Sequence, residues 1–172
     1  MDLDLGEAVA RLGDLEARPS ALAVIDAAGG SAVPALRAGL RHGHWRVRHM
    51  SARLLDDLPL DAETLELLLE VARTDSHRKV RAQAYHAAGC DACKPAGSGA
   101  CEFDKVGMLV AALADGSLRV RRRATTGLLF EAVLNTSDDL RVRAAIRAVA
   151  SDPDPTIARR AQLASRYRTS GS

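Results

Sequence analysis

DSHRKVRAQAYHAA, residues 75–88, is the stretch that decides the fold, because three other segments share its pattern. They are HGHWRVRHMSARLL (42–55), DGSLRVRRRATTGL (115–128) and DPDPTIARRAQLAS (152–165). Each has a β-branched residue followed four positions later by a small one: Val47 and Ser51, Val80 and Ala84, Val120 and Ala124, Ile157 and Ala161. Successive β-branched residues lie 33, 40 and 37 positions apart, the length of a helix–turn–helix unit. The sequence therefore predicts repeated helix pairs.

The segments that precede these four have the apolar periodicity of amphipathic helices. Apolar side chains recur at i, i+3, i+4 and i+7 in residues 31–43, 61–74, 104–116 and 137–151. Residues suited to N-caps stand just before most of the predicted helices: Asp61, Asp75, Asp104, Asp115, Ser137 and Asp152. Only 3% of the residues are aromatic, and Ala, Leu and Val dominate the apolar set, which favours closely packed helices over sheets.

The repeated pattern, Asp-x4-Val-Arg-x-x-Ala, resembles the second helix of HEAT repeats and of the related repeats in phycobilin lyases. The resemblance covers about residues 30–168, with His42 replacing the Asp in the first copy and Ala158 replacing the Arg in the fourth. It implies an all-α fold, a right-handed α-solenoid of about four to five HEAT-like helix pairs. We expect a single domain with three special parts: capping helices in 1–29, a loop insertion at 94–102 and a frayed tail at 169–172 within residues 1–172.

Charge is distributed unevenly between the first and second helices, although the formal net charge is only +2. The second-helix segments contain fourteen Lys or Arg residues and no Asp or Glu: 45–54, 77–86, 117–126 and 156–168. The first helix at 61–74, by contrast, carries four acidic residues against Arg73. Since second helices generally line the concave side of HEAT solenoids, the resemblance implies a basic inner groove and an anionic partner.

The candidate partner-binding residues lie on these second helices. They are Trp45, Arg46, Lys79, Arg119, Arg122, Arg123, Arg159 and Arg160. Trp45, the single tryptophan, could stack on a ligand or simply fill the space between two repeats. A solvated basic face without function is the alternative for the cations. The Arg after each β-branched residue resembles the HEAT arginine that bonds turn aspartates of neighbouring repeats, so a structural role is expected for Arg48, Arg81 and Arg121.

All three cysteines lie in one stretch, YHAAGCDACKPAGSGACEF (85–103). With a histidine they form H-x3-C-x2-C-x7-C: His86, Cys90, Cys93 and Cys101. His86 and Cys90 share one face at a helix end, and C-x2-C is the spacing with which two thiolates chelate one tetrahedral ion. A Cys3His set suits zinc and leaves no open coordination position, which indicates a structural zinc site. Free or disulfide-forming thiols and an iron–sulfur cluster are the alternatives.

No recognised catalytic motif occurs in the chain, which lacks HExxH, P-loop, GxGxxG and GxSxG sequences. His42, His44 and His49 cluster near one another but have no acidic residues in the arrangement of HEAT-like di-iron hydroxylases. The repeats and basic groove also resemble HEAT-like alkylpurine DNA glycosylases, which use a carboxylate on the concave face. Because the second-helix segments contain no acid, we expect a protein that is not an enzyme; glycosylase or lyase activity is the minority interpretation.

These features favour an interaction module that receives an acidic protein segment. A nucleic-acid-binding HEAT protein, related to DNA glycosylases or to DNA repair, is the alternative function. The N-terminal residues 1–16 are acidic and amphipathic, unlike a signal peptide, and no long apolar run stands out. We therefore expect a cytoplasmic protein that does not contact a membrane.

Overall fold

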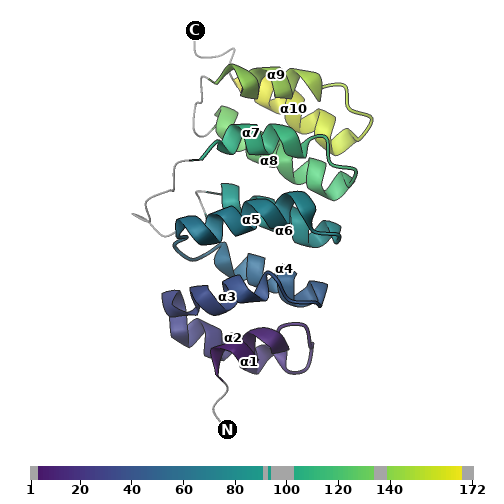
Figure 1. Ribbon diagram of the computed structural model, residues 1–172. Coiled ribbons are helices and arrows are strands. Elements are labelled where there is room, and N and C mark those ends of the chain that lie inside the picture. Colours follow the sequence, from purple (N-terminus) through teal and green to yellow (C-terminus); the bar gives the residue numbers. More distant parts are fainter. Residues whose placement is uncertain (1–3, 91–92, 94–102, 134–138, 168–172) are drawn as a thin grey trace. The chain divides into compact units, whose positions relative to one another are not determined.

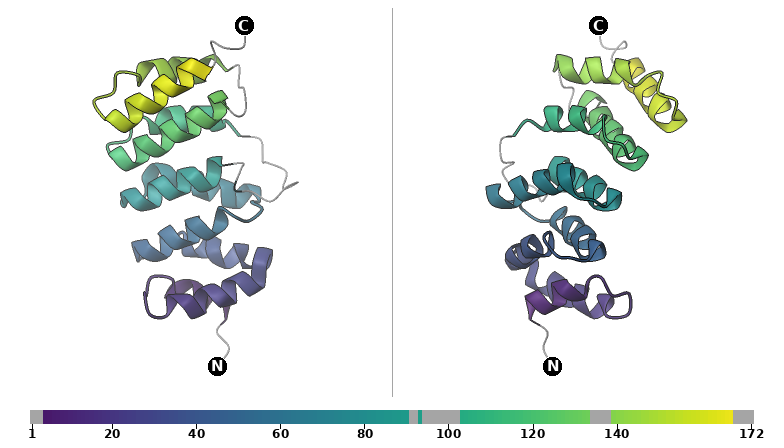
Figure 2. Two further views of the ribbon diagram at one scale, coloured as in Figure 1. Left: turned by 180° about the vertical axis from the view of Figure 1, so that it is seen from behind. Right: turned by 45° about the vertical axis from the view of Figure 1, so that its right-hand side comes forward.

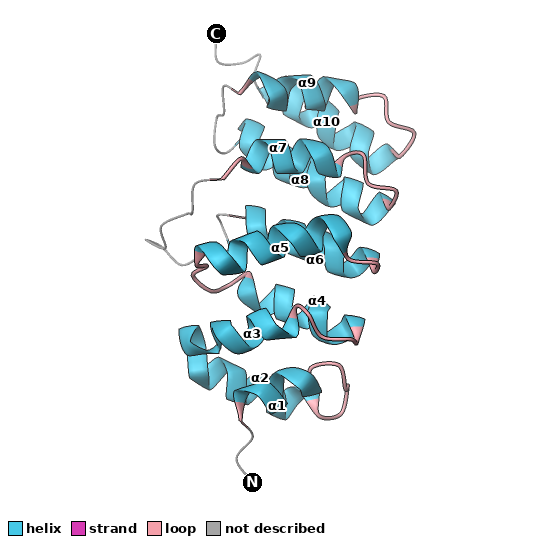
Figure 3. Cartoon of the chain, in the orientation of Figure 1, coloured by secondary structure: helices cyan, strands magenta, loops and turns pink. Residues whose placement is uncertain are grey.

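The computed structural model describes residues 4–90, 93, 103–133 and 139–167, which form helices and connecting loops (Figure 3). No strand occurs in these ranges, so the prediction of an all-α protein is confirmed. The helices group into two compact units, Met1–Glu102 and Phe103–Ser172. The single domain expected over residues 1–172 stays a prediction.

Helix pairs build the first unit (Figure 1). In order they are α1 (Leu5–Arg11) with α2 (Arg18–Ala28), α3 (Val33–Gly39) with α4 (Trp45–Leu55), and α5 (Ala62–Thr74) with α6 (Arg78–Gly89). A short 3-10 helix, η1 (Gly29–Ala32), joins α2 to α3. The second helices α4 and α6 pack against each other, and α1 packs against α2.

The second unit repeats this arrangement. Its pairs are α7 (Lys105–Ala112) with α8 (Leu118–Val133) and α9 (Leu140–Ala148) with α10 (Pro155–Tyr167). The second helices α8 and α10 again lie side by side (Figure 2). A buried cluster that includes Leu109, Leu128 and Ile146 holds these four helices together.

The repeated positions of the sequence form the core of each unit. Val47, Val80, Val120 and Ile157 are at most 1% exposed, and so are the small residues one turn later, Ser51, Ala84, Ala124 and Ala161. Where a side chain would obstruct close packing, the chain has glycine: a Cβ on Gly39 of α3 would lie 2.6 Å from Val9 Cγ1 of α1. The repeat pattern therefore marks the places where helices approach most closely.

The turn before each second helix is built in one way in both units. The first residue of the turn accepts a hydrogen bond from the backbone N–H two positions later: His42 from His44, Asp75 from His77, Asp115 from Ser117, and Asp152 from Asp154. The first copy, which lacks the Asp, makes this bond with His42 Nδ1 at 3.0 Å. Asp75, Asp115 and Asp152 were expected to cap the second helices. Their side chains instead accept hydrogen bonds within the turn that precedes each helix.

In α4, α6 and α10 the cap is the residue two positions further on. His44 Nδ1 accepts from the Arg46 N–H, and His77 Nδ1 accepts from the Lys79 N–H, both at 3.3 Å. In the last repeat, Asp154 Oδ1 accepts from the Ile157 N–H at 3.1 Å. A histidine can take this role only while its Nδ1 is unprotonated.

The caps expected for the first helices agree with the structure at two positions. Asp61 accepts from the Thr64 N–H, and Asp104 accepts from the Gly107 N–H. Ser137 lies outside the described residues, and the cap of α9 is Asp139, which accepts from the Arg141 N–H at 2.8 Å.

Among the described residues, one segment, Arg18–Gly39, is apolar and long enough to cross a membrane by length and composition alone, and its most apolar window has a mean hydropathy of 1.2. The expectation that no such run exists is therefore wrong for this segment. In the structure it comprises α2, η1 and α3. Gly29 interrupts it with a φ of 52°, a conformation that favours glycine. Both α2 and α3 pack against α1.

Candidate metal site and basic helix ends

Three of the four predicted metal ligands come together at the end of α6. His86 lies in the last turn, Gly89 ends the helix, and the extended backbone of Cys90 (φ −94°, ψ 101°) leads the chain away. One side-chain donor atom from each of His86, Cys90 and Cys93 lies within 4.8 Å of the other two. The two Sγ atoms are 3.1 Å apart, and Cys93 Sγ is 3.6 Å from His86 Nε2. These three side chains could hold a metal ion.

A carboxylate that the sequence pattern did not predict lies beside this cluster. Asp56, the C-cap residue of α4, is buried, and its Oδ2 lies 3.1 Å from His86 Nε2. The imidazole nitrogen that faces Cys93 therefore also faces a carboxylate. Asp56 follows two leucines at the end of a helix, and neither spacing nor residue type distinguishes it in the sequence from the exposed Asp57.

The environment favours the protonated thiol at Cys93 in the absence of a cation. Burial raises the pKa of the Cys93 thiol to about 12, with contributions from the Cys90 sulfur and from the charges of Asp56 and Asp57. A bound cation reverses this balance, since the thiolate is the metal ligand. Two soft sulfur donors and an imidazole form a donor set that suits zinc. Cys101, the fourth predicted ligand, lies outside the described residues.

Trp45 lies where α4 and α6 begin. Its ring stacks on the His77 ring with centroids 3.9 Å apart and planes 10° from parallel. Two cations also lie over the indole: Arg46 Cζ is 5.2 Å and Lys79 Nζ 5.3 Å from its centroid. Trp45 is half-buried, so it fills space between two repeats and also keeps some exposed surface.

His77 is a second residue that was not predicted as part of a site. It is the counterpart of His44 in the next repeat. Burial lowers its pKa, and the charges of Lys79, Arg78 and Arg48 lower it further against the opposing effect of Asp75. The neutral ring is the form that can accept the Lys79 N–H. Trp45, Arg46, His77 and Lys79 are named the Trp45 cluster below.

The predicted partner-binding arginines of the second unit are in two different situations. Arg122 makes a double hydrogen bond to Asp154, at 3.0 and 2.6 Å, and Arg160 donates to the Arg122 carbonyl at 3.0 Å. The Arg122 guanidinium holds the pKa of Asp154 below its usual value. Three others have no ion pair within the described ranges: Arg119, Arg123 and Arg159.

The arginines expected to be structural bond to the turns. Each donates to the carbonyl six residues before it: Arg48 to His42, Arg81 to Asp75, and Arg121 to Asp115. Arg48 also pairs with Asp75 of the next repeat, with Nε 2.6 Å from Oδ2. Burial raises the pKa of Asp75, but hydrogen bonds from Arg48 and the His77 N–H outweigh it, so the pKa lies below its usual value.

Comparison with known proteins defines the class. Residues 5–89 match the family of HEAT repeats. A computationally designed armadillo repeat protein for modular peptide recognition is similar in structure, with 15% identity, a TM-score of 0.55, and coverage of 98% of this chain and 84% of that chain. The YibA protein of Escherichia coli shows 18% identity and a TM-score of 0.48 over 96% of this chain and 71% of that one. No curated protein sequence matches significantly.

The protein is therefore an all-α repeat protein of the α-solenoid class. More particularly, residues 5–89 are similar to HEAT repeats, and this match lies in the first unit. Repeat folds of this class generally serve as interaction scaffolds and not as enzymes.

Proposed function

We propose that this protein is a non-enzymatic interaction module, that an acidic protein segment binds at the Trp45 cluster, and that a structural zinc ion lies at the end of α6. The observation that carries the first part is the placement of Arg46 and Lys79 beside one aromatic ring at two adjacent helix starts. Within the described residues, neither cation pairs with a carboxylate.

The local electrostatics favour a carboxylate ligand at this place. The positive ends of two helix dipoles add to the charges of Arg46 and Lys79. The nearby carboxylate of Asp75 is already bonded to Arg48, so it does not neutralise them. The fold shared with a protein designed for peptide recognition supports a peptide as the partner. The cations on α8 and α10 extend this proposal to the second unit through Arg119, Arg123 and Arg159.

Peptide binding tests the proposal, and Trp45 is the reporter because it is the only tryptophan. A Glu-rich peptide should change its fluorescence, and a Gln-rich peptide of equal length should not. The double variant Arg46→Gln/Lys79→Gln should weaken binding by about tenfold or more. The matched control Arg53→Gln/Arg73→Gln removes the same charge from exposed positions of the first unit and should leave affinity unchanged.

The same variants separate a protein partner from nucleic acid. Nucleic acid would replace the acidic segment as the ligand if duplex DNA bound more tightly than the peptide. That binding should also fall steeply with salt and be lost in Arg46→Glu/Lys79→Glu/Arg119→Glu. Weak DNA binding that these changes leave unaltered would remove nucleic acid from consideration. Equal peptide affinity in the Gln double variant and its control would overturn the acidic-segment proposal.

The zinc proposal rests on the convergence of His86, Cys90 and Cys93, with Cys101 as fourth ligand. When bound, the ion would cross-link the end of α6 to the chain that follows, which couples metal binding to folding. Protein purified without added metal should contain about one equivalent of zinc, and chelation should lower its melting temperature. Cys93→Ser should lose the metal, whereas His42→Asn, a histidine outside the cluster, should retain it. Only trace metal together with three freely titratable thiols would contradict the site.

A further inference from the structure

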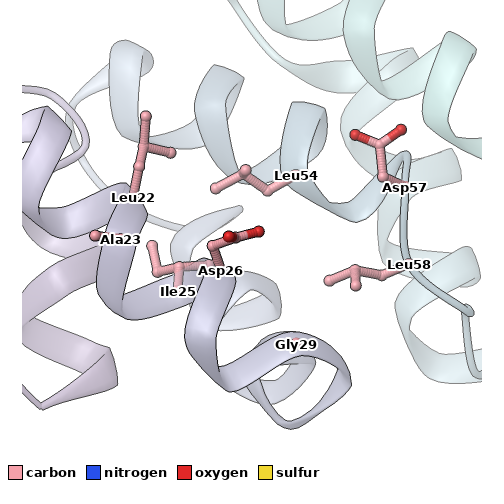
Figure 4. Close-up of a pocket in the computed structure, with 8 residues that line it drawn as sticks. All are labelled: Leu22, Ala23, Ile25, Asp26, Gly29, Leu54, Asp57 and Leu58. Carbon is pink, nitrogen blue, oxygen red and sulfur yellow. The ribbon is translucent and has the colours of Figure 1, made fainter.

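A cavity of about 330 Å³ opens on the first unit between α2 and the C-terminal end of α4 (Figure 4). Its apolar surface comes from Leu22 and Ile25 of α2 and from Leu54 and Leu58 at and after the end of α4. Three of these side chains are half-buried and Ile25 is buried, so well-packed apolar side chains form the base of the cavity. None of the residues that line this cavity belongs to the proposed zinc site or to the Trp45 cluster.

Two carboxylates stand at this apolar surface. Asp26 extends from α2, and Asp57 extends from the turn after α4 (Figure 4). Both are exposed, and neither forms a hydrogen bond or ion pair through its side chain within the described part of the chain. By contrast, the neighbouring Asp56 is turned inward to His86. The cavity therefore combines an apolar surface with two carboxylates that no described residue pairs with.

The residues of α2 at this cavity are apolar apart from Asp26. They belong to Arg18–Gly39, whose most apolar window is only 28% buried. Of the α2 residues that line the cavity, Ala23 is exposed and Leu22 is half-buried. Apolar surface that remains accessible next to a concave site is typical of a place where another molecule binds.

We propose that this groove binds a partner segment in which a large apolar side chain stands next to Lys or Arg. The apolar side chain enters between Leu22, Leu54 and Leu58, and the cation pairs with Asp26 or Asp57. Burial of the apolar base of the cavity contributes affinity without selectivity, and the two carboxylates provide selectivity for the cation. An anionic lipid surface is disfavoured, because the same carboxylates repel it.

This ligand has the opposite charge to the segment proposed for the Trp45 cluster. The two surfaces share no residue, so either proposal can fail without the other. Variants at Arg46 and Lys79 should leave binding at the groove unaltered, and variants at the groove should leave binding of Glu-rich peptide unaltered.

Selection from a random peptide display library on the full-length protein tests the groove. Ala23→Phe is the counter-target, because Ala23 lines the cavity and is exposed, so a phenyl ring there fills the groove without entering the core. Peptides that bind the wild type and not Ala23→Phe should be enriched in Leu, Ile or Phe next to Lys or Arg. Circular dichroism and the melting temperature establish that the variant is folded.

Charge-neutral variants give a second measurement that does not depend on Ala23→Phe. For the enriched peptides, Asp26→Asn/Asp57→Asn should weaken binding by about tenfold. The matched control Glu66→Gln/Glu70→Gln removes the same charge from exposed positions on α5 and should have no effect. The proposal is overturned by a lack of enrichment, by enriched peptides without basic residues, by equal binding to Ala23→Phe, or by binding of anionic vesicles that depends on Ala23.

Discussion

The starts of the second helices differ between the two units, although the repeat pattern places similar residues there. In the first unit, the cap residue of α6 is His77, and Trp45 of the preceding repeat stacks on it. In the second unit, the equivalent residue is Asp154, and Arg122 of the preceding repeat pairs with it. The type of the cap residue therefore differs between the two units, and so does the side chain of the preceding repeat that contacts it.

This difference determines which cations remain available. In the second unit the carboxylate at the cap position pairs with Arg122, whereas in the first unit the imidazole at that position stacks on Trp45, and Arg46 and Lys79 lie over the same indole. The recurrence of a cation in the repeat pattern therefore does not show that it is available to a ligand. The turn of the following repeat has to be known as well.

The largest expected effect concerns the inter-repeat pairs themselves. Arg48→Ala should lower the free energy of unfolding by about 3 kcal/mol, because it leaves the carboxylate of Asp75, which is 5% exposed, without its partner. Arg122→Ala should have a smaller effect, because the Arg122 side chain is 42% exposed. Urea denaturation of both variants measures the difference. An Arg122 variant as destabilised as the Arg48 variant would contradict this ranking.

The next effect concerns the aromatic contact of the first unit. Trp45→Ala should lower the free energy of unfolding by about 2 kcal/mol, since it removes apolar contact and the stack on His77. Phe130 of α8, which is 47% exposed, provides an aromatic comparison, and Phe130→Ala should change stability less. Thermal unfolding followed by circular dichroism measures both. Wild-type stability in the Trp45 variant would mean that the indole does not join the repeats.

Exchanging the cap types should convert one helix start into the other. His77→Asp places a carboxylate beside Arg46 and Lys79, so binding of a Glu-rich peptide should fall while the N-cap is kept. Asp154→Ser keeps a capping side chain but releases Arg122, so binding at the second unit should not fall. Peptide titrations of the two variants measure this. Unaltered affinity in His77→Asp would separate the binding surface from the Trp45 cluster.

The smallest expected effect is a difference in pH dependence. The folded protein lowers the pKa of His77 from its usual 6.5, so the contribution of this cap is present above pH 6.5 and is lost as the pH falls toward the lowered value. The pKa of Asp154 is lowered from its usual 3.8, so its contribution is lost only below that pH. His77→Ser should abolish the first change in a series of melting temperatures from pH 7 to pH 5. If the melting temperature of His77→Ser still falls between pH 7 and pH 5 as in the wild type, a titratable group other than His77 causes the fall.

Much of the fold followed from short-range patterns. The four β-branched positions and the small residues after them identified the second helices and their buried faces, because helix packing has a fixed spacing along the chain. Asp61 and Asp104 identified two helix starts for the same reason. The pattern did not show that Asp75 and Asp152 hydrogen-bond within the turn while His77 and Asp154, two positions later, cap the helix.

The candidate site followed from the sequence to a smaller extent. The spacing of His86, Cys90 and Cys93 predicted their convergence, because all three lie within one helix end and the chain that follows it. Asp56 could not be found in this way, because it reaches His86 from another helix. The same limit applied to Arg122, whose partner is 32 positions away.

The sequence by itself determined the helix pairs, the buried repeat positions and the cluster of His86, Cys90 and Cys93, since each depends on residues within about two helical turns of one another. Only the tertiary structure decided which charges are paired, which carboxylate faces His86, and that Asp26 and Asp57 border an apolar cavity. These features depend on side chains of different helices meeting in space. Packing of successive repeats, rather than local spacing, brings them together.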